Sequence, residues 1–145
     1  MKAFSFLLIG TLFFYQSEWG TDFEQAKLKA TQEHKCILLN FSGSDWCGPC
    51  IKLAKDVFGK EDFINMASTN LVLVNADFPR QKKNQLPKDL QKQNNTLADK
   101  YNEDGIFPLT VLLTSDGKLV RKWEGYPNNA KTFINQIKTA AGGSK

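Results

Sequence analysis

An apolar run, Cys36 to Phe41 (CILLNF), leads into two cysteines, Cys47 and Cys50, that are separated by a glycine and a proline. A short, nearly continuous apolar run is typical of a strand that is covered on both faces. A helix is expected to begin inside the cysteine motif, because Pro49 suits the first turn of a helix, where its missing N–H is not needed. The two thiols therefore lie where a buried strand passes into a helix, which favours an α/β fold with helices on both faces of a sheet.

The rest of the chain repeats this alternation of strands and helices. Apolar runs at 71–76 and 109–114 predict two more buried strands, and a turn at 115–117 joins the second of them to a strand over 119–123 as a hairpin. Three helices are expected: from a capping box at Thr21 up to His34, from the cysteine motif to a left-handed cap at Gly59, and from Asn128 or Asn129 through Ile137.

A polar segment, 80–100, interrupts this pattern. It contains only three large apolar side chains, all of them leucines. Pro87 and Thr96 each indicate a helix start, so the segment is expected to form two short helical pieces rather than a disordered loop. We interpret it as a surface insertion.

Size and composition are those of an ordinary globular domain. The 145 residues suffice for one domain with a core, and 41% of them are hydrophobic while 23% are charged. A domain of this size does not need disulfides to be stable, so its three cysteines need not be structural. The net charge is only +4, and the basic doublets are limited to Lys82–Lys83 and Arg121–Lys122, which argues against nucleic acid as a partner.

The first twenty residues predict export. Lys2 is followed by an uncharged apolar run, Ala3 to Tyr15, which is short for a membrane span but has the length of a signal-peptide core. Ser17 could end the signal, although Tyr15 is bulky where a small residue is preferred. We therefore expect 1–20 to be a signal peptide or an N-terminal membrane anchor, and 21–145 to be the folded domain. No cysteine follows the run, which excludes a lipoprotein anchor.

The spacing of the two cysteines fits a pair that exchanges disulfides. Unpaired N–H groups and the dipole at a helix N-terminus favour negative charge, so Cys47 is expected to ionise readily and attack a disulfide. Cys50 lies one turn further along the same face and can resolve the mixed disulfide. Gly48 leaves room for a substrate, Pro49 stiffens the turn, and Trp46 packs beside the sulfur atoms.

The motif and two further segments resemble the thioredoxin family. WCGPC at 46–50 lies between the predicted strand and helix, 75–77 (NAD) ends the next strand, and Phe107-Pro108 comes before a third strand, where the family carries a cis-proline. The resemblance covers residues 21–140. The resemblance implies the thioredoxin-like α/β fold, a central mixed β-sheet flanked by helices, with the polar segment inserted before the cis-proline.

The resemblance also implies an activity and a site. The pieces SDWCGPC, LADKYN and WEGYP are most similar to exported thioredoxin-like proteins of Gram-negative envelopes, and the Gly-Pro spacer resembles that of reducing members. We expect a monomeric, periplasmic thiol–disulfide oxidoreductase that reduces protein disulfides, is recharged by a membrane-embedded electron donor and uses no cofactor or metal. Its catalytic, redox-active pair is Cys47 and Cys50. The residues expected to contact substrate are Trp46, Gly48, Pro49, Phe107 and Pro108.

One pair of positions departs from the family. Thioredoxin has a buried Asp in the strand before the motif, which helps to move the proton of the resolving thiol, and a Lys in the next strand that pairs with it. Asn40 and Leu73 occupy these positions here. The joint loss is physically consistent, because a buried lysine without its carboxylate is costly. The remaining candidates for the proton acceptor are Asp45, a water and the substrate.

Three alternatives compete with a redox role for the cysteine motif. A structural disulfide across so small a loop adds little stability, and a binding or chaperone-like module could keep the fold without the reaction. The third alternative is a zinc site, which would need four ligands, and the available cysteines and histidine are Cys47, Cys50, His34 and Cys36.

Cys36 is otherwise expected to be an inert, buried strand residue, with a regulatory thiol as its alternative role. His34 is expected to be a surface residue.

Overall fold

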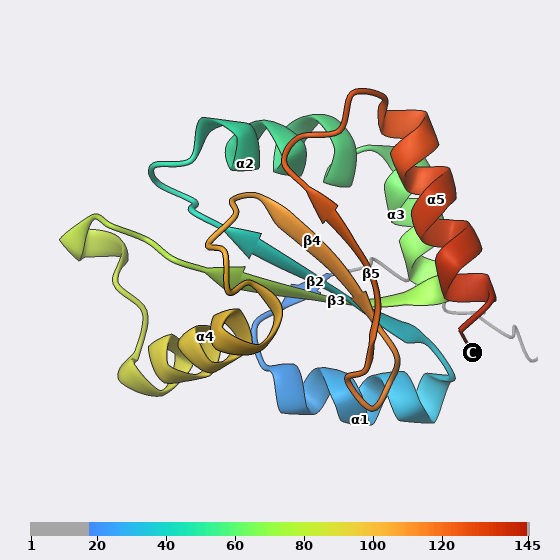
Figure 1. The fold of residues 1–145 in the computed structure, drawn as a ribbon, viewed down its shortest axis with the longest axis horizontal. Coiled ribbons are helices and arrows are strands. Elements are labelled where there is room, and N and C mark those ends of the chain that lie inside the picture. The colour runs from blue at the N-terminus through green and yellow to red at the C-terminus, as the bar shows by residue number, and fades with distance from the viewer. Residues whose placement is uncertain (1–17, 145) are drawn as a thin grey trace, which may run out of the picture.

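The computed structural model describes residues 18–144, whose strands form one five-stranded sheet in the order β1-β3-β2-β4-β5 (Figure 1). The first three strands along the chain are parallel, whereas β4 pairs antiparallel with β2 and β5 pairs antiparallel with β4. This is the mixed sheet that the resemblance implies. Its elements are β1 (Trp19–Gly20), α1 (Phe23–Glu33), β2 (Cys36–Ser42), α2 (Gly48–Leu53), the π-helical turn η1 (Ala54–Phe58), α3 (Glu61–Asn70), β3 (Leu71–Asp77), the 3-10 turn η2 (Lys82–Asn84), α4 (Lys88–Tyr101), β4 (Leu109–Leu113), β5 (Leu119–Glu124) and α5 (Ala130–Gly142).

The central strands are buried because their side chains are apolar on both faces. Every residue of β2 and of β4 is buried. The apolar runs expected at 36–41, 71–76 and 109–114 match β2, β3 and β4 to within one residue. The edge strand β5 is more exposed and carries Arg121 and Lys122, and charged side chains of this kind protect an edge from pairing with other chains.

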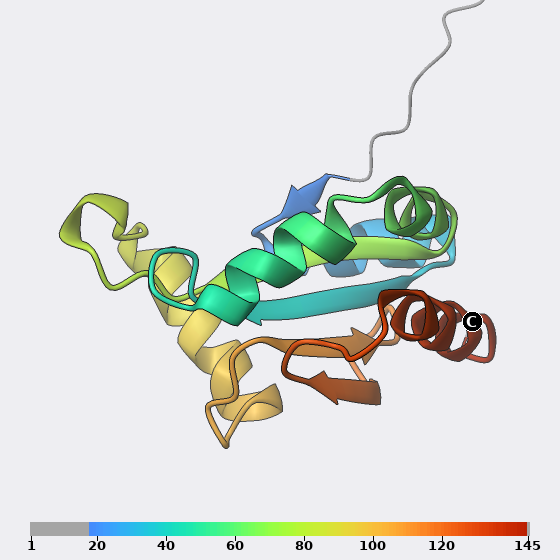
Figure 2. The same cartoon turned by 90° about the horizontal axis from the view of Figure 1, so that it is seen from above.

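The helices form two layers, one on each face of the sheet (Figures 1 and 2). Side chains of α1 and α4 close one core, which includes Phe41, and side chains of α2, η1, α3 and α5 close the other, which includes Phe63. Because β2 and β3 are parallel and in register up to Ser42 and Asp77, both strands end at the same edge of the sheet. The loop with the cysteines and the segment after β3 therefore lie side by side.

The ends of two helices differ from the sequence-based expectation. Asp22, not Thr21, caps α1, and its Oδ1 accepts the Gln25 N–H at 2.9 Å. A left-handed cap is expected at Gly59, but Gly59 has φ of −83°. The helix that ends in a left-handed residue is α1, where His34 has φ of 53°. The helix after the cysteines needs no left-handed cap because it ends in the π-helical turn η1.

The inserted segment also differs in detail. Instead of two short helical pieces, 80–100 holds the turn η2 and most of one long helix, α4. Thr96 does not begin a helix, because its hydroxyl donates back to the Lys92 carbonyl at 3.0 Å within α4. The part before α4 projects beyond the ends of the strands (Figures 1 and 2).

The sheet begins two residues before the expected start of the folded domain. Trp19 and Gly20 of β1 pair with Leu73 and Val74 of β3. Most of the expected signal or anchor, 1–20, lies outside the described residues, which begin at residue 18. Within 18–144, no helix is long and apolar enough to cross a membrane.

Candidate active site

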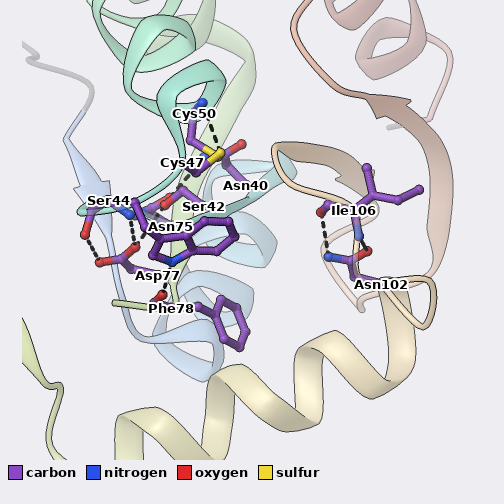
Figure 3. The surroundings of a disulfide bond; sticks show 11 residues. Asn40, Ser42, Ser44, Cys47, Cys50, Asn75, Asp77, Phe78, Asn102 and Ile106 are labelled. Carbon is purple, nitrogen blue, oxygen red and sulfur yellow. Dashed lines mark hydrogen bonds between the residues drawn. A yellow bond between two sulfur atoms is a disulfide. The ribbon is translucent and has the colours of Figure 1, made fainter. Parts of the chain in front are cut away.

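Cys47 and Cys50 form a disulfide where β2 passes into α2, with Cα atoms 5.3 Å apart (Figure 3). Cys47 is the N-cap of α2, and its Sγ accepts the backbone N–H of Cys50 at 3.3 Å. The Cys47 N–H in turn donates to the Gly43 carbonyl at 2.8 Å. Pro49 occupies the first turn, as expected. This backbone places both sulfur atoms at the end of the helix where the dipole favours negative charge.

Burial does not distinguish the two cysteines in the disulfide form. Cys47 is 5% exposed and Cys50 is 4% exposed. The two residues between them are exposed, and a Cβ added to Gly48 would meet nothing within 4 Å. A partner molecule can therefore approach the disulfide over Gly48 and Pro49.

Trp46 is fixed beside the disulfide by contacts on several sides. Its Nε1–H donates to the Phe78 carbonyl oxygen at 2.7 Å, and its ring meets Phe107 edge-on with centroids 5.4 Å apart. The Arg80 guanidinium lies 3.7 Å from the ring centroid, which is a cation–π contact. A Cβ at Gly43 would lie 2.2 Å from the ring, so this position has room only for glycine.

The peptide bond between Phe107 and Pro108 is cis, as the resemblance implies. Residues on both sides of Phe107 are anchored through their backbones. Asn102 donates to the Ile106 carbonyl at 2.9 Å and accepts the Ile106 N–H at 2.8 Å, a pair of bonds drawn in Figure 3. The Pro108 carbonyl accepts the Gly125 N–H at 2.8 Å. These bonds hold the loop before β4 in place.

Asp45 anchors the inserted segment to the cysteine loop. Its carboxylate accepts the backbone N–H groups of Arg80 and Gln81, both at 2.9 Å, and the Asn84 side-chain amide at 3.0 Å. The hydrogen bond from the Arg80 N–H is the main reason that the pKa of Asp45 is lowered. Asp45 is one candidate for the proton acceptor of Cys50, and the hydrogen-bond donors to its carboxylate all come from the inserted segment.

Asn40 is buried, as expected from its alignment with the carboxylate of thioredoxin. It is 6% exposed and lies opposite Asn75 in the register of β2 and β3, with its Nδ2 donating to the Asn75 Oδ1 at 3.1 Å. Leu73, at the position of the family lysine, lies opposite Leu38 and is 3% exposed. The Asn40 Oδ1 is buried and has no hydrogen-bond partner among residues 18–144.

A row of polar side chains continues from Asn40 towards the ends of β2 and β3 (Figure 3). The Ser42 hydroxyl lies 3.1 Å from the Asn75 Oδ1 and 3.3 Å from the Asp77 Oδ1. Asp77 also accepts the backbone N–H of Ser44 at 2.8 Å and the Ser44 hydroxyl. The row therefore leads from a buried amide to a partly exposed carboxylate.

A pocket of about 590 Å³ adjoins both Cys50 and this polar row. Asn40, Ser42 and Asn75 line it from the sheet, and Lys55 is the charged residue in its wall. Trp19 of β1 closes another side. Cys50 thus has a cavity beside it that reaches the polar row.

Sequence reasoning missed two of these residues, although each has a signal in the sequence. Asn102 comes at the end of α4 and just before the turn at Gly105, a position where asparagine often bonds to the backbone. Ser42 follows Asn40 by two residues, so both side chains lie on one face of β2. Two polar side chains on the same face at the end of an otherwise apolar strand indicate that this end of the face is not part of the hydrophobic core.

The structure does not bring together the residues of the zinc alternative. Cys36 starts β2 and the motif follows its other end, while His34 is exposed at the end of α1. Cys36 is buried, with its Sγ 3.8 Å from the Ala141 carbonyl of α5. Among residues 18–144, no three His, Cys, Asp or Glu side chains are grouped as metal ligands.

Comparisons with known proteins match most of this chain. A family model described as a thioredoxin-like domain matches residues 23–141. The disulfide bond reductase DsbH of Chlamydia pneumoniae is 31% identical over 123 residues, which cover 85% of this chain and 72% of that protein. The thioredoxin-related protein DsbJ of the same organism is 26% identical over 110 residues, 76% of this chain but 31% of DsbJ.

A solved structure gives the same result in three dimensions. The DsbH oxidoreductase superposes with a TM-score of 0.78 at 28% identity, over 88% of this chain and 85% of the other. Sequence family, relatives and fold agree with the disulfide-bonded pair at the start of α2. The chain therefore belongs to the thioredoxin-like family, and it is a thiol–disulfide oxidoreductase.

Proposed function

We propose that the chain reduces disulfide bonds of exported proteins through Cys47 and Cys50. The observation that carries the proposal is the position of the pair at the start of α2, beside exposed Gly48 and Pro49. The thiolate of reduced Cys47 attacks one sulfur of a substrate disulfide, the other substrate sulfur leaves as a thiolate, and a mixed disulfide forms. Cys50 then attacks the Cys47 sulfur, which releases the second substrate thiol and leaves the Cys47–Cys50 disulfide.

The substrate is proposed to bind as an extended segment beside Phe107. This residue lies between Ile106 and Pro108, whose backbone groups are held by other parts of the chain. An extended substrate can pair with the backbone at Phe107 like an added strand. The Trp46 ring contacts Phe107, so it is proposed to pack against the same substrate segment. Gly48 and Pro49 leave the path to the sulfur atoms open.

Reduction in the periplasm is the proposed direction and place of the reaction. DsbH carries the name of a disulfide bond reductase, and the Gly48–Pro49 spacer resembles that of reducing members. The apolar run at 3–15 supports export, with or without a lasting membrane tether. Each turnover leaves the pair oxidised, so in an oxidising compartment a donor must reduce it again. By analogy with the family, this donor is proposed to be membrane-embedded. The protein is proposed to act as a monomer.

Reduction of insulin by dithiothreitol tests this activity, with the turbidity of the released chains as the readout. The wild type is expected to accelerate the reaction, and Cys47→Ser to abolish the acceleration because it removes the nucleophile. Cys36→Ser serves as the control and should keep most of the activity, since Cys36 lies at the other end of β2 from the motif.

Two outcomes would count against the proposal. If wild type and Cys47→Ser are equally inactive while both still bind an exported protein, the chain is a binding module. The direction is tested separately, by equilibrating the protein with glutathione buffers and trapping its thiols. A pair that becomes reduced even in mostly oxidised glutathione would have a high reduction potential and would make the protein an oxidant of its substrates.

A further inference from the structure

The resolving step of the proposed reaction needs an acceptor for one proton. Cys50 must lose its thiol proton before it can attack the Cys47 sulfur, and it is 4% exposed in the disulfide form. The family's acceptor position holds Asn40, which cannot take up a proton. Asp45 lies in the cysteine loop, but the partners of its carboxylate belong to the inserted segment, and Asp45 does not line the pocket beside Cys50. The proton must therefore leave by another route.

The pocket beside Cys50 has features of a site for water. Asn40 lines it, and the Asn40 Oδ1 is a buried acceptor without a hydrogen-bond partner among the described residues. An acceptor of this kind is commonly satisfied by a buried water. The Ser42 residue lines the same pocket, and its hydroxyl can accept one hydrogen bond while it donates another. Cys50, Asn40 and Ser42 thus line the same pocket.

Ser42 connects this pocket to a carboxylate. Its single hydroxyl proton can point to the Asn75 Oδ1 at 3.1 Å or rotate to the Asp77 Oδ1 at 3.3 Å. Asp77 is partly exposed, so a proton received there can pass on to solvent. Among the residues that form this row, Asp77 is the one with an ionisable side chain.

We propose that Asp77 is the proton acceptor for Cys50, reached through a water in this pocket and the Ser42 hydroxyl; the proposal deepens the proposed reductase reaction and rests on it. The Cys50 S–H bond breaks and its proton passes to the water. The water gives a proton to Ser42, and Ser42 gives its own to the Asp77 carboxylate. The Cys50 thiolate then attacks Cys47. Asn40 is a positioning residue, because it holds the water through its Oδ1.

Other charged groups near this route are few. Lys55 of η1 lines the pocket and favours the thiolate of Cys50 by its positive charge, while it cannot accept the proton in its charged form. Arg80 follows β3 but its guanidinium stacks on Trp46. From α4, Asn94 donates its amide to the Asp77 backbone carbonyl at 3.0 Å and brings no charge. From β1, Trp19 adds none.

The two half-reactions can be measured separately with 5,5′-dithiobis(2-nitrobenzoate) in a stopped-flow instrument. Attack by Cys47 on this probe releases one coloured thiolate, and resolution by Cys50 releases the second. Asp77→Asn is expected to slow the second phase about a hundredfold, the lower range for a positioned acid–base group, and to leave the first phase unchanged. Added formate should restore the second phase in proportion to its concentration, because a free carboxylate replaces the missing acceptor. Asp99→Asn, the same change on the exposed side of α4, is the matched control.

Ser42 gives a second test that keeps the backbone and Asp77 in place. Ser42→Ala should slow the second phase in the same way, and Ser42→Thr, which restores a hydroxyl, should recover most of the rate. A second phase that is unchanged in Asp77→Asn or in Ser42→Ala overturns the relay. Equal slowing of both phases, or no rescue by formate or threonine, also overturns it, because both indicate a structural role. A wild type with no first phase would instead contradict the proposed function.

Discussion

The amide of Asn40 sets this chain apart from the thioredoxin pattern that the rest of it follows. Asn40 is buried against Asn75, and the strand neighbour at the family's lysine position is the buried Leu73. Both positions are therefore uncharged here, whereas thioredoxin has an ion pair at them. An uncharged amide avoids the large desolvation penalty of a lone buried carboxylate.

Restoring the carboxylate alone is expected to destabilise the protein. In Asn40→Asp, burial without a counter-charge raises the folded-state pKa of the new carboxyl above its unfolded value of about 3.9. The cost is therefore absent below that pH, grows as the pH rises towards the folded-state pKa, and is complete at neutral pH. We expect a loss of about 3 kcal/mol at neutral pH, which corresponds to roughly two pKa units. Urea unfolding at acid and neutral pH measures it.

The control for this prediction is the double variant Asn40→Asp with Leu73→Lys. The added ammonium should recover part of the loss at neutral pH, since neighbouring sites couple. A loss of equal size at acid and neutral pH would show that the change in shape, rather than the charge, is responsible.

At the scale of elements, the connection between β3 and α4 is held by one side chain from another loop. Asp45 accepts two consecutive backbone N–H groups, those of Arg80 and Gln81, and thereby places Arg80 on the Trp46 ring. The inserted segment is thus tied to the cysteine loop at a defined point. Its order depends on a carboxylate that is ionised at neutral pH.

Loss of that charge is expected to loosen the segment 80–84. The pKa of Asp45 is lowered, chiefly by the Arg80 N–H, so its contribution is present above the ordinary value of 3.8 and is lost as the pH falls through the folded-state pKa. Asp45→Ala should have the same effect at neutral pH. Amide hydrogen exchange at Arg80 and Gln81 is the measurement, with faster exchange expected.

Asp116→Ala provides the matched control for this change. The pKa of Asp116 is also lowered, mainly by the hydrogen bond from the Thr114 side chain, but Asp116 lies in the turn between β4 and β5. It should leave exchange at 80–84 unaltered. Unchanged exchange in Asp45→Ala would mean that packing of Arg80 on Trp46 alone holds the segment.

Elements with continuous apolar runs could be predicted from the sequence, and those that depend on distant partners could not. β2, β3 and β4 follow from their own residues, as does the cap by Asn129, whose Oδ1 accepts the Thr132 N–H at 2.9 Å. The cysteine pair and the cis-proline were found from motifs. The role of Asp45 was missed because its partners lie 35 to 39 residues away and depend on how two loops meet in space, whereas that of Asn102, whose partner Ile106 is only four residues away, had a local signal. The single helix α4 was misjudged because a local threonine signal competed with its tertiary packing.

At the scale of the whole molecule, the sheet separates two hydrophobic cores, and the third cysteine reports on one of them. Cys36 is 1% exposed and packs in the core that α2, α3 and α5 close. In the oxidised protein, the sulfur atoms of Cys47 and Cys50 are joined and do not react with maleimides.

Labelling of the oxidised protein by N-ethylmaleimide is therefore expected to follow global unfolding. Cys36 should react only when the core opens, so the opening free energy from labelling rates should equal that from urea unfolding. Both should fall with the same dependence on urea. Cys36→Ala should remove the labelling. A labelling rate that does not depend on urea would instead identify local fraying of α5, whose Ala141 carbonyl lies 3.8 Å from the Cys36 Sγ.

The position of β1 has a consequence for the order in which the sheet assembles. Although β1 is the first strand within residues 18–144, it lies at the edge of the sheet that these residues form and pairs there with β3 alone, through Trp19 and Gly20. The parallel pair β2–β3 and the antiparallel pair β2–β4 form without it. The other four strands can thus assemble first, and β1 can dock last. Under the proposed export, retention or removal of a leader would change where the protein resides, while the pairing of β2 with β3 and β4 stays the same.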